Sequence, residues 1–217
     1  EEIYKMSTQV LDALTYMQES QEKPIYHRDI KPSNIMWHKR EIYKLIDFNI
    51  ASTIDDKAFA GTQPFMAPDL IMSNRKIDWD KSADTFALGV TIYELLAHTH
   101  PWPGSESRPS IAVEPVDIRK HNDRLTDEMA EFVMKSIVTD RNKRFKTAQE
   151  MLAALKDIGI NGTLKGTTIT RSEKIDDTDP VDYINSLYSQ SKHGNSGTRA
   201  SAKSSLFDKL TYTETKL

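Results

Sequence analysis

The stretch that decides the fold is Tyr26-His27-Arg28-Asp29-Ile30-Lys31-Pro32-Ser33-Asn34, which is followed by Leu45-Ile46-Asp47-Phe48-Asn49. The first segment places a carboxylate, an ammonium group and an amide in one short polar loop. The second segment places another carboxylate directly after an apolar, strand-like run. Asp29, Lys31, Asn34 and Asp47 therefore lie within a short length of chain.

The residues between these two segments predict a β-hairpin. Ile35-Met36-Trp37 and residues 42–46 are rich in residues that favour strands, and the polar run 38–41 favours a turn between them. Because the two ends of a hairpin lie side by side, the hairpin brings Asn34 close to Asp47. Shared ligation of metal ions requires this proximity.

The flanking sequence carries apolar residues at three- and four-residue steps, the pattern of helices packed on a core. Residues 83–96 are apolar nearly all round, so we expect this helix to be central and buried. Thr147-Ala148-Gln149-Glu150 is a capping box, in which the threonine accepts from a free amide and the glutamate reaches back. The predicted helices cover residues 3–19, 83–96, 129–137 and 148–155, with loops at 47–68 and 105–124.

The chain changes character near residue 158. Residues 159–217 are rich in Ser, Thr, Gly and Lys, with sparse apolar positions and one short predicted helix at 179–187. We therefore expect one folded domain over residues 1–158. Over residues 159–217 we expect a partly disordered linker or the start of a second module.

Composition excludes several function classes. The formal net charge of −3 supplies no basic field for nucleic acid or anionic lipid, so neither is expected as a partner. The absence of cysteine excludes a thiolate zinc site and a cysteine nucleophile, and it fits a cytoplasmic location. No apolar run approaches the roughly 18 residues that indicate a membrane span.

The polar side chains of the loop suit phosphoryl transfer. That reaction needs oxygen ligands for metal ions, a cation near the phosphates and an acceptor for the substrate's proton. Asn34 and Asp47 carry the oxygen atoms that Mg²⁺ prefers. Lys31 supplies the cation, and Asp29 supplies the proton acceptor. A single aspartate in a turn can simply cap backbone N–H groups. The wider sequence pattern therefore has to distinguish a catalytic role from a capping one.

That wider pattern resembles the eukaryotic-type serine/threonine protein kinases over roughly residues 1–158. Their catalytic loop H-R-D-x-K-x-x-N and their D-F-G motif match this chain, except that Asn49 replaces the glycine. The resemblance implies a mainly α, C-lobe helical bundle with a small β-hairpin at the active site. Further matching motifs follow in the family's order: Gly61-Thr62 with Ala67-Pro68-Asp69, Asp84-x-Phe86-x-x-Gly89, His100-Pro101-Trp102 and Arg141-x-x-Arg144-Phe145.

The resemblance also implies a role for each residue of the loop. Asp29 orients the substrate hydroxyl and accepts its proton, Lys31 neutralises charge on the transferring phosphoryl group, and Thr62 lies against both. Asn34 and Asp47 hold the metal ions, and Met36 lies under the adenine ring. The residues implied to bind ATP and Mg²⁺ are Lys31, Ser33, Asn34, Met36 and Asp47.

Other positions inherit regulatory or structural roles from the resemblance. Arg28 is expected to pair with a phosphate on the activation loop, where Ser52 and Thr53 are the best-placed acceptors. The alternative is that both are ordinary loop hydroxyls. The expected structural contacts are hydrogen bonds from the catalytic-loop backbone to Asp84 and a buried bridge between Asp69 and Arg144.

The chain departs from the family pattern in several places. Asparagine tolerates the left-handed backbone better than most residues, so Asn49 is expected to preserve the loop but to limit its switching. Asp69 stands where the family has a glutamate, so its side chain must reach Arg144 with one methylene group less. No G-x-G-x-x-G loop occurs in the chain. We therefore expect a fragment lacking the N-lobe, which binds ATP poorly and is nearly inactive alone.

Three hypotheses follow from the sequence. The leading one is ATP-dependent phosphoryl transfer to serine and threonine hydroxyls of protein substrates by the full-length parent. The Lys31-Pro32 pattern favours this branch over tyrosine kinases, and the Ala67-Pro68-Asp69 segment disfavours aminoglycoside-type phosphotransferases. The second is a pseudokinase or scaffold, which would not need all four polar side chains. The third adds a separate module beyond residue 159.

Overall fold

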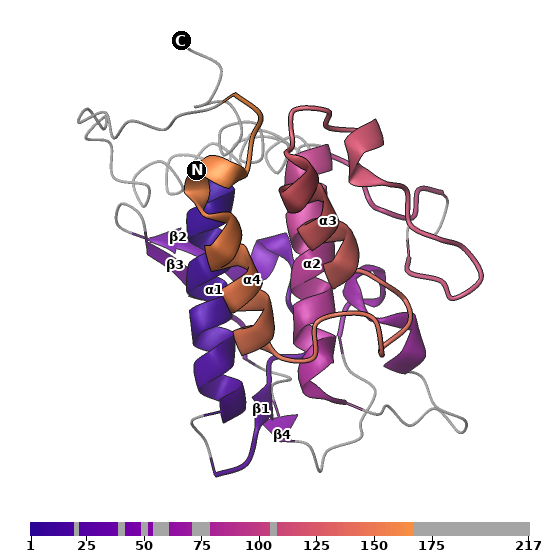
Figure 1. Cartoon of the computed structure of the whole chain (residues 1–217). Helices are drawn as coiled ribbons and strands as arrows, with labels where there is room; N and C mark the ends of the chain where they lie inside the picture. Colours follow the sequence, from indigo (N-terminus) through magenta and orange to yellow (C-terminus); the bar gives the residue numbers. More distant parts are fainter. Residues whose placement is uncertain are drawn as a thin grey trace, which may run out of the picture.

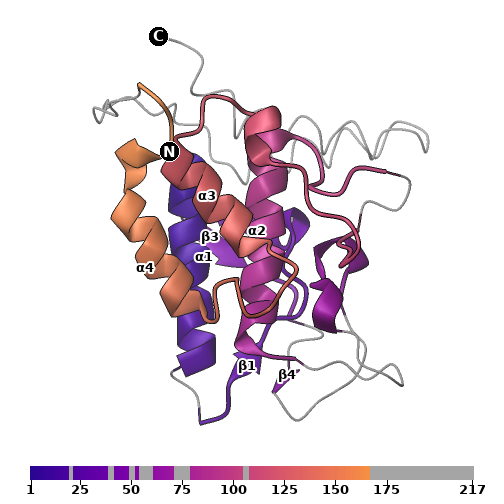
Figure 2. The same ribbon diagram turned by 45° about the vertical axis from the view of Figure 1, so that its right-hand side comes forward.

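A computed structural model describes residues 1–19, 22–38, 42–48, 52–53, 61–70, 79–104 and 108–166. Within these ranges the chain forms four α-helices: α1 (Glu2–Glu19), α2 (Lys81–Ala97), α3 (Asp127–Ser136) and α4 (Ala148–Ile158). Helix α1 packs beside α4, and α2 packs beside α3 (Figures 1 and 2). Helix α2 also contacts α1 and α4, so it lies at the centre of the bundle.

Helix α1 forms as its apolar periodicity predicted. Met6, Val10 and Leu14 recur on one face and are almost fully buried. Burying such a face supplies most of a helix's stability in a folded protein, because isolated helices are marginal in water. The opposite face carries the exposed Tyr16.

Helix α2 is buried along nearly its whole length, which confirms the prediction of a central helix. Its first turn is capped by Asp80, whose side chain accepts a hydrogen bond from Ser82 N at 2.8 Å. Gly89 lies where α2 meets α3, and a Cβ atom there would come within 2.2 Å of Ser136 Oγ. The glycine therefore allows the two helices to approach closely. The helix ends at His98, which takes a left-handed backbone conformation.

Helices α3 and α4 begin at threonine caps. Thr126 accepts from Met129 N, and Thr147 accepts from Glu150 N, each at 3.1 Å. The carboxylate of Glu150 accepts from Lys146 N at 2.8 Å. The predicted capping box is therefore present, but its glutamate reaches the residue before the threonine cap.

The predicted hairpin is confirmed. Strands β2 (Ile35–His38) and β3 (Ile42–Leu45) pair antiparallel, with Ile35 opposite Leu45 and His38 opposite Ile42. Tyr43 fixes the hairpin to α1, because its backbone N–H donates to Gln9 Oε1 at 2.8 Å and its hydroxyl donates to Glu2 Oε2 at 2.7 Å. The hairpin therefore lies against α1 (Figure 1).

The remaining regular structure consists of short pieces. Residues 47–68 were predicted as a loop, but β4 (Ser52–Thr53) pairs antiparallel with β1 (Ile25–Tyr26). A two-residue strand is too short to show a periodicity, so the sequence pattern could not reveal it. Single turns of 3₁₀-helix occur at η1 (Pro32–Asn34), η2 (Gln63–Phe65), η3 (Pro68–Leu70), η5 (Ile118–Lys120) and η6 (Ile160–Gly162).

The described chain stays in contact with the bundle beyond residue 158. Leu164 forms a β-bridge with Leu125 and is itself buried, while Thr126 N donates to Thr163 O at 3.3 Å. The predicted helix at 179–187 lies outside the described residues. No helix in the described part of the chain combines the length and the apolar character needed to cross a membrane.

Candidate active site

The polar loop lies between β1 and β2 and is held by the central helix. Both carboxylate oxygens of Asp84 accept backbone hydrogen bonds, from His27 N at 2.8 Å and from Arg28 N at 2.9 Å. Asp84 is 1% exposed. Its burial raises the pKa of the carboxyl group, and the two N–H donors and the charges of His27 and Arg28 oppose this shift. Helix α2 thereby fixes the start of the loop.

The loop backbone is bent sharply at Arg28, whose φ of 70° lies in the left-handed region. That conformation costs a residue with a Cβ atom about 1–2 kcal/mol, so contacts around it must hold it. Besides Asp84, Gly61 approaches Arg28 from the segment that carries Thr62. A Cβ atom on Gly61 would lie 2.6 Å from Arg28 O, so only glycine permits this approach.

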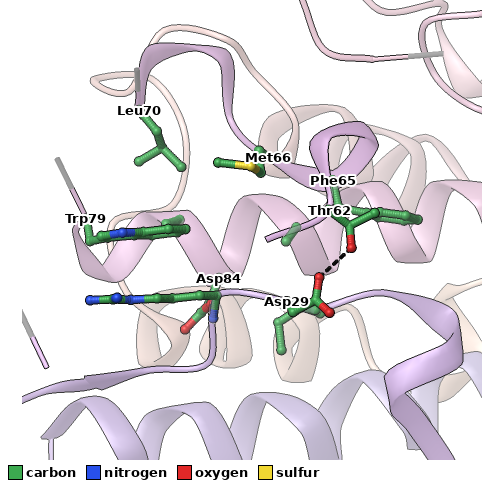
Figure 3. Close-up of a pocket in the computed structure, with 11 residues that line it drawn as sticks. Asp29, Thr62, Phe65, Met66, Leu70, Trp79 and Asp84 are labelled. Atoms are coloured by element: carbon green, nitrogen blue, oxygen red, sulfur yellow. Dashed lines mark hydrogen bonds between the residues drawn. The ribbon is translucent and has the colours of Figure 1, made fainter. Parts of the chain in front are cut away.

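Asp29 is the centre of a cluster of polar side chains. Thr62 Oγ1 donates to Asp29 Oδ1 at 2.5 Å (Figure 3), and Lys31 Nζ donates to Asp29 Oδ2 at 2.6 Å. Lys31 Nζ also lies 2.8 Å from Thr62 Oγ1. Asn34 Nδ2 donates both to Asp29 Oδ2, at 2.9 Å, and to Asp29 O, at 2.8 Å. The structure therefore brings together four residues that the sequence analysis had proposed as catalytic.

This cluster keeps Asp29 ionised at neutral pH. Partial burial alone would raise the pKa of the Asp29 carboxyl group. The hydrogen bonds from Lys31, Thr62 and Asn34 and the positive charge of Lys31 outweigh it, so the pKa lies below its ordinary value of 3.8. The result is a carboxylate with a fixed orientation that can receive a hydrogen bond or a proton.

Asn34 and Asp47 lie at the two ends of the hairpin, as predicted. Ile46 N donates to Asn34 O at 2.9 Å, which places the residue before Asp47 against Asn34. Asp47 is exposed and has a φ of 67°, so its backbone also takes the left-handed conformation. The side-chain oxygens of an aspartate and an asparagine are of the kind that a hard cation such as Mg²⁺ prefers, and Mg²⁺ also retains several waters.

The other residues proposed to bind ATP lie on the same part of the chain. Ser33 is exposed in η1, and Met36 is 38% exposed on β2. Phe48 is 48% exposed, and its ring makes an edge-to-face contact with His27, with 4.7 Å between the ring centroids. The rim of the site therefore presents apolar as well as polar side chains.

A small pocket lies behind Asp29, between the loop, the η2–η3 segment and α2. Figure 3 shows Asp29 and Thr62 at one end and Trp79 and Leu70 at the other, with Met66 and Asp84 between them. Most of its wall is apolar. Arg28 also lines it, with only 4% of the residue exposed.

Of the residues proposed for regulation, Arg28 lines the pocket, whereas Ser52 and Thr53 lie on a short strand. The guanidinium carbon of Arg28 lies 4.9 Å from the ring centroid of Trp79, so this cation has an aromatic ring as a partner inside the pocket. The backbones of Ser52 and Thr53 form β4. Asn49, the unusual residue of the D-F-G position, lies outside the described residues.

The expected bridge between Asp69 and Arg144 is present and has more members than the sequence suggested. Arg144 donates to both carboxylate oxygens of Asp69, at 2.8 and 3.0 Å, and its side chain is fully buried. Arg141 Nε donates to the same carboxylate at 2.7 Å, and Arg141 also pairs with Asp80 at 3.3 Å. Two arginines therefore compensate for the shorter side chain of aspartate at position 69.

Three residues that contact the polar loop or the segments around it had no individual role in the sequence analysis. His27 Nε2 lies 3.2 Å from Ile46 O and so links the loop to the end of the hairpin. His100 accepts from Trp102 N at 3.1 Å, and its other ring nitrogen lies 2.9 Å from Pro64 O. Trp79 covers Arg28. His27 belongs to the H-R-D motif and His100 to the His100-Pro101-Trp102 motif, which were usable signals, whereas Trp79 belongs to no quoted motif.

Comparison with known proteins gives similarity to kinases from distant organisms. Dual specificity mitogen-activated protein kinase kinase sek-1 of Caenorhabditis elegans is 30% identical over 152 residues, which cover 66% of this chain and 45% of that protein. Serine/threonine-protein kinase PknB of Mycolicibacterium smegmatis is 29% identical over 158 residues, which cover 67% of this chain and 25% of the relative. The chain thus spans less than half the length of these relatives.

The family comparison covers most of the folded part of the chain. Residues 1–155 match the family model described as "Protein kinase domain". The match includes the loop around Asp29, the hairpin and helices α1 to α3, and it ends within α4. The chain therefore belongs to the protein kinase family.

Proposed function

We propose that residues 1–158 are the C-lobe of a serine/threonine protein kinase. The longer protein transfers the γ-phosphoryl group of ATP to hydroxyl groups of protein substrates. The observation that carries this proposal is the Asp29 carboxylate, which Lys31, Thr62 and Asn34 hold in one orientation by hydrogen bonds of 2.5–2.9 Å. The name of the bacterial relative PknB supports serine and threonine as acceptors.

In this proposal Asp29 accepts a hydrogen bond from the substrate hydroxyl and takes its proton as the oxygen–phosphorus bond forms. ADP leaves with the electron pair of the broken bond. Lys31 lies 2.6 Å from Asp29, so its ammonium group faces the place where charge develops on the transferring phosphoryl group. Thr62 and Asn34 fix the Asp29 carboxylate, which supplies the positioning on which this reaction depends.

Asn34 and Asp47 would hold Mg²⁺, which neutralises charge on the phosphates when it is bound. Ser33 and Met36 would contact ATP on the same rim. The chain itself contains no G-x-G-x-x-G sequence, and it spans 25–45% of the two relatives' length. We therefore propose that phosphoryl transfer belongs to the longer protein, with little activity in residues 1–217 alone.

The test uses the full-length protein, radiolabelled ATP and a basic protein substrate. Asp29→Asn should lower transfer by about 10²–10⁴-fold, because the amide keeps the shape of the side chain but cannot accept the proton. Asp123→Asn, an exposed position in a remote turn, controls for the loss of one charge and should leave the rate unchanged. Phosphoamino-acid analysis then identifies the acceptor hydroxyl.

Two results would overturn the proposal in different ways. Equal labelling by the wild type and Asp29→Asn would show that Asp29 has no catalytic role. Absence of magnesium-dependent nucleotide binding by the full-length protein in calorimetry would favour the scaffold hypothesis. Labelled tyrosine in place of serine or threonine would retain the kinase assignment but change the acceptor class.

A further inference from the structure

We propose that Trp79 is a positioning residue for the catalytic loop and that it acts through a cation–π contact with Arg28. This inference rests on the proposed kinase function. Trp79 lies just before α2, five residues from Asp84 and far along the chain from the loop. It belongs to none of the motifs that identify the family in this sequence.

The contact between Arg28 and Trp79 is close and largely shielded from water. The guanidinium carbon of Arg28 lies 4.9 Å from the centroid of the Trp79 ring, and the two residues are only 4% and 5% exposed. A cation is attracted to the face of an aromatic ring within about 6 Å, most strongly to tryptophan, and the attraction grows when water is excluded. Leu70 and Met66 form the apolar wall around the contact.

The position of Arg28 in the chain makes this contact relevant to catalysis. Arg28 directly precedes Asp29, and its backbone is in the left-handed region with a φ of 70°. Asp84 holds the Arg28 backbone N–H, and the close approach of Gly61 constrains its carbonyl. Trp79 holds the side chain. Three separate segments therefore fix the residue whose conformation sets the direction of the Asp29 side chain.

The charges around Arg28 agree with this arrangement. The buried carboxylate of Asp84 lies in the same pocket and favours the cation electrostatically. The indole ring of Trp79, which Figure 3 shows at the end of the pocket away from Asp29, covers the guanidinium. The loop consequently has an internal partner for Arg28, supplied by the fold itself.

The experiment compares Trp79→Phe with Trp79→Leu in the full-length protein. Both substitutions keep a buried apolar side chain, but only phenylalanine keeps an aromatic face for Arg28. Trp79→Leu should lower kcat about tenfold, which corresponds to roughly 1.4 kcal/mol of transition-state stabilisation, with the KM for ATP unchanged. Trp79→Phe should retain most of kcat.

Phe132→Leu is the matched control. Phe132 is 4% exposed on α3 and packs against Phe145, away from the catalytic loop. This variant removes a buried aromatic ring of the same core and should leave kcat unchanged. Equal losses of kcat in Trp79→Leu, Trp79→Phe and Phe132→Leu would indicate general destabilisation and overturn the inference.

Backbone hydrogen exchange of residues 27–34, measured in the same full-length variants, is independent of activity. Exchange should rise in Trp79→Leu and remain at the wild-type rate in Trp79→Phe and Phe132→Leu. This measurement supports or rejects the contact even where a failed transfer assay has rejected the kinase function. Unchanged exchange in Trp79→Leu, or raised exchange with an unchanged kcat, would overturn the positioning role.

Discussion

Among the residues that the structure describes, Glu94 has a carboxyl group whose pKa burial raises into the neutral range. It lies in the last turns of α2, and desolvation there raises the pKa of its carboxyl group from 4.5 to about 7. In the unfolded chain the same group ionises near its ordinary value. The folded state therefore binds the proton more tightly than the unfolded state does.

This difference predicts a pH dependence of stability. The contribution of Glu94 is fully present below about pH 4.5 and is lost as the pH rises through about 7, because the folded state must then bury a charge. Glu94→Gln should remove this decline. Urea unfolding at pH 5 and pH 8 measures it, with the exposed Glu131→Gln on α3 as the control. An equal decline in wild type and Glu94→Gln would contradict the prediction.

At the same scale, the sequence predicted the members of the Asp29 cluster but not all their neighbours. Lys31 and Asn34 are close to Asp29 in the chain, so a short loop cannot place them far away. Thr62 was predicted through the resemblance and lies 2.5 Å from Asp29. Trp79 contacts Arg28 across the fold, and no local pattern marks such a contact.

The elements are joined by ion pairs as well as by apolar packing. Arg144, in the segment before α4, donates to Asp69 in η3 and lies 3.3 Å from Ser82 Oγ at the start of α2. Its guanidinium carbon also lies 5.1 Å from the ring centroid of Phe86. One buried side chain therefore fixes three segments relative to one another.

Removal of this arginine should be costly. Arg144→Met keeps much of the apolar volume but leaves the Asp69 carboxylate with fewer donors, so the free energy of unfolding should fall by about 3 kcal/mol. Arg141 still pairs with Asp69, which places the expected value at the low end for a broken buried pair. Urea unfolding measures the change. Lys143→Met, whose side chain is 74% exposed, should change stability by less than about 0.5 kcal/mol.

Acid should weaken the same bridge. Burial raises the pKa of Asp69, but the hydrogen bonds and charges of Arg144 and Arg141 outweigh it and lower the pKa below 3.8. Its stabilising contribution is therefore present above about pH 3.8 and is lost as the pH falls through the lower folded value. In Arg144→Met the free energy of unfolding should fall less on acidification than it does in the wild type. An unfolding free energy equal to that of the wild type would show that the bridge contributes nothing.

The helices themselves were predictable from periodicity, because each buries one face or, for α2, nearly its whole surface. The short strand β4 was not predicted, since its partner β1 lies far away in sequence and only two residues pair. The displaced capping box at α4 also shows that a side chain's backbone partner depends on the final geometry.

At the scale of the whole molecule, Gln18 joins three helices that are distant in sequence. It lies near the end of α1 and is 2% exposed. Its Nε2 donates to Lys81 O at the start of α2, and its Oε1 accepts from Ala148 N at the start of α4, both at 3.1 Å. The side chain thus satisfies backbone groups at the ends of two other helices.

Gln18→Leu should lower the free energy of unfolding by about 2 kcal/mol, because buried backbone groups then lose their hydrogen-bond partners. Chemical denaturation of the chain measures this change. Tyr16→Phe, at a 63% exposed position of the same helix end, should have little effect. A leucine variant as stable as the wild type would show that water or another group replaces the amide.

The sequence by itself indicated the residues proposed to carry the chemistry and where the four described helices lie. Both are recorded in local spacing, through the motif around Asp29 and the three- to four-residue period of apolar side chains. The resemblance predicted that Asp84 holds the loop backbone, but the tertiary structure alone revealed the contacts of Gly61 and Trp79 with Arg28. Asp84 from α2, Gly61 and Trp79 converge on Arg28 from separate segments, and only the packed bundle brings them within contact distance.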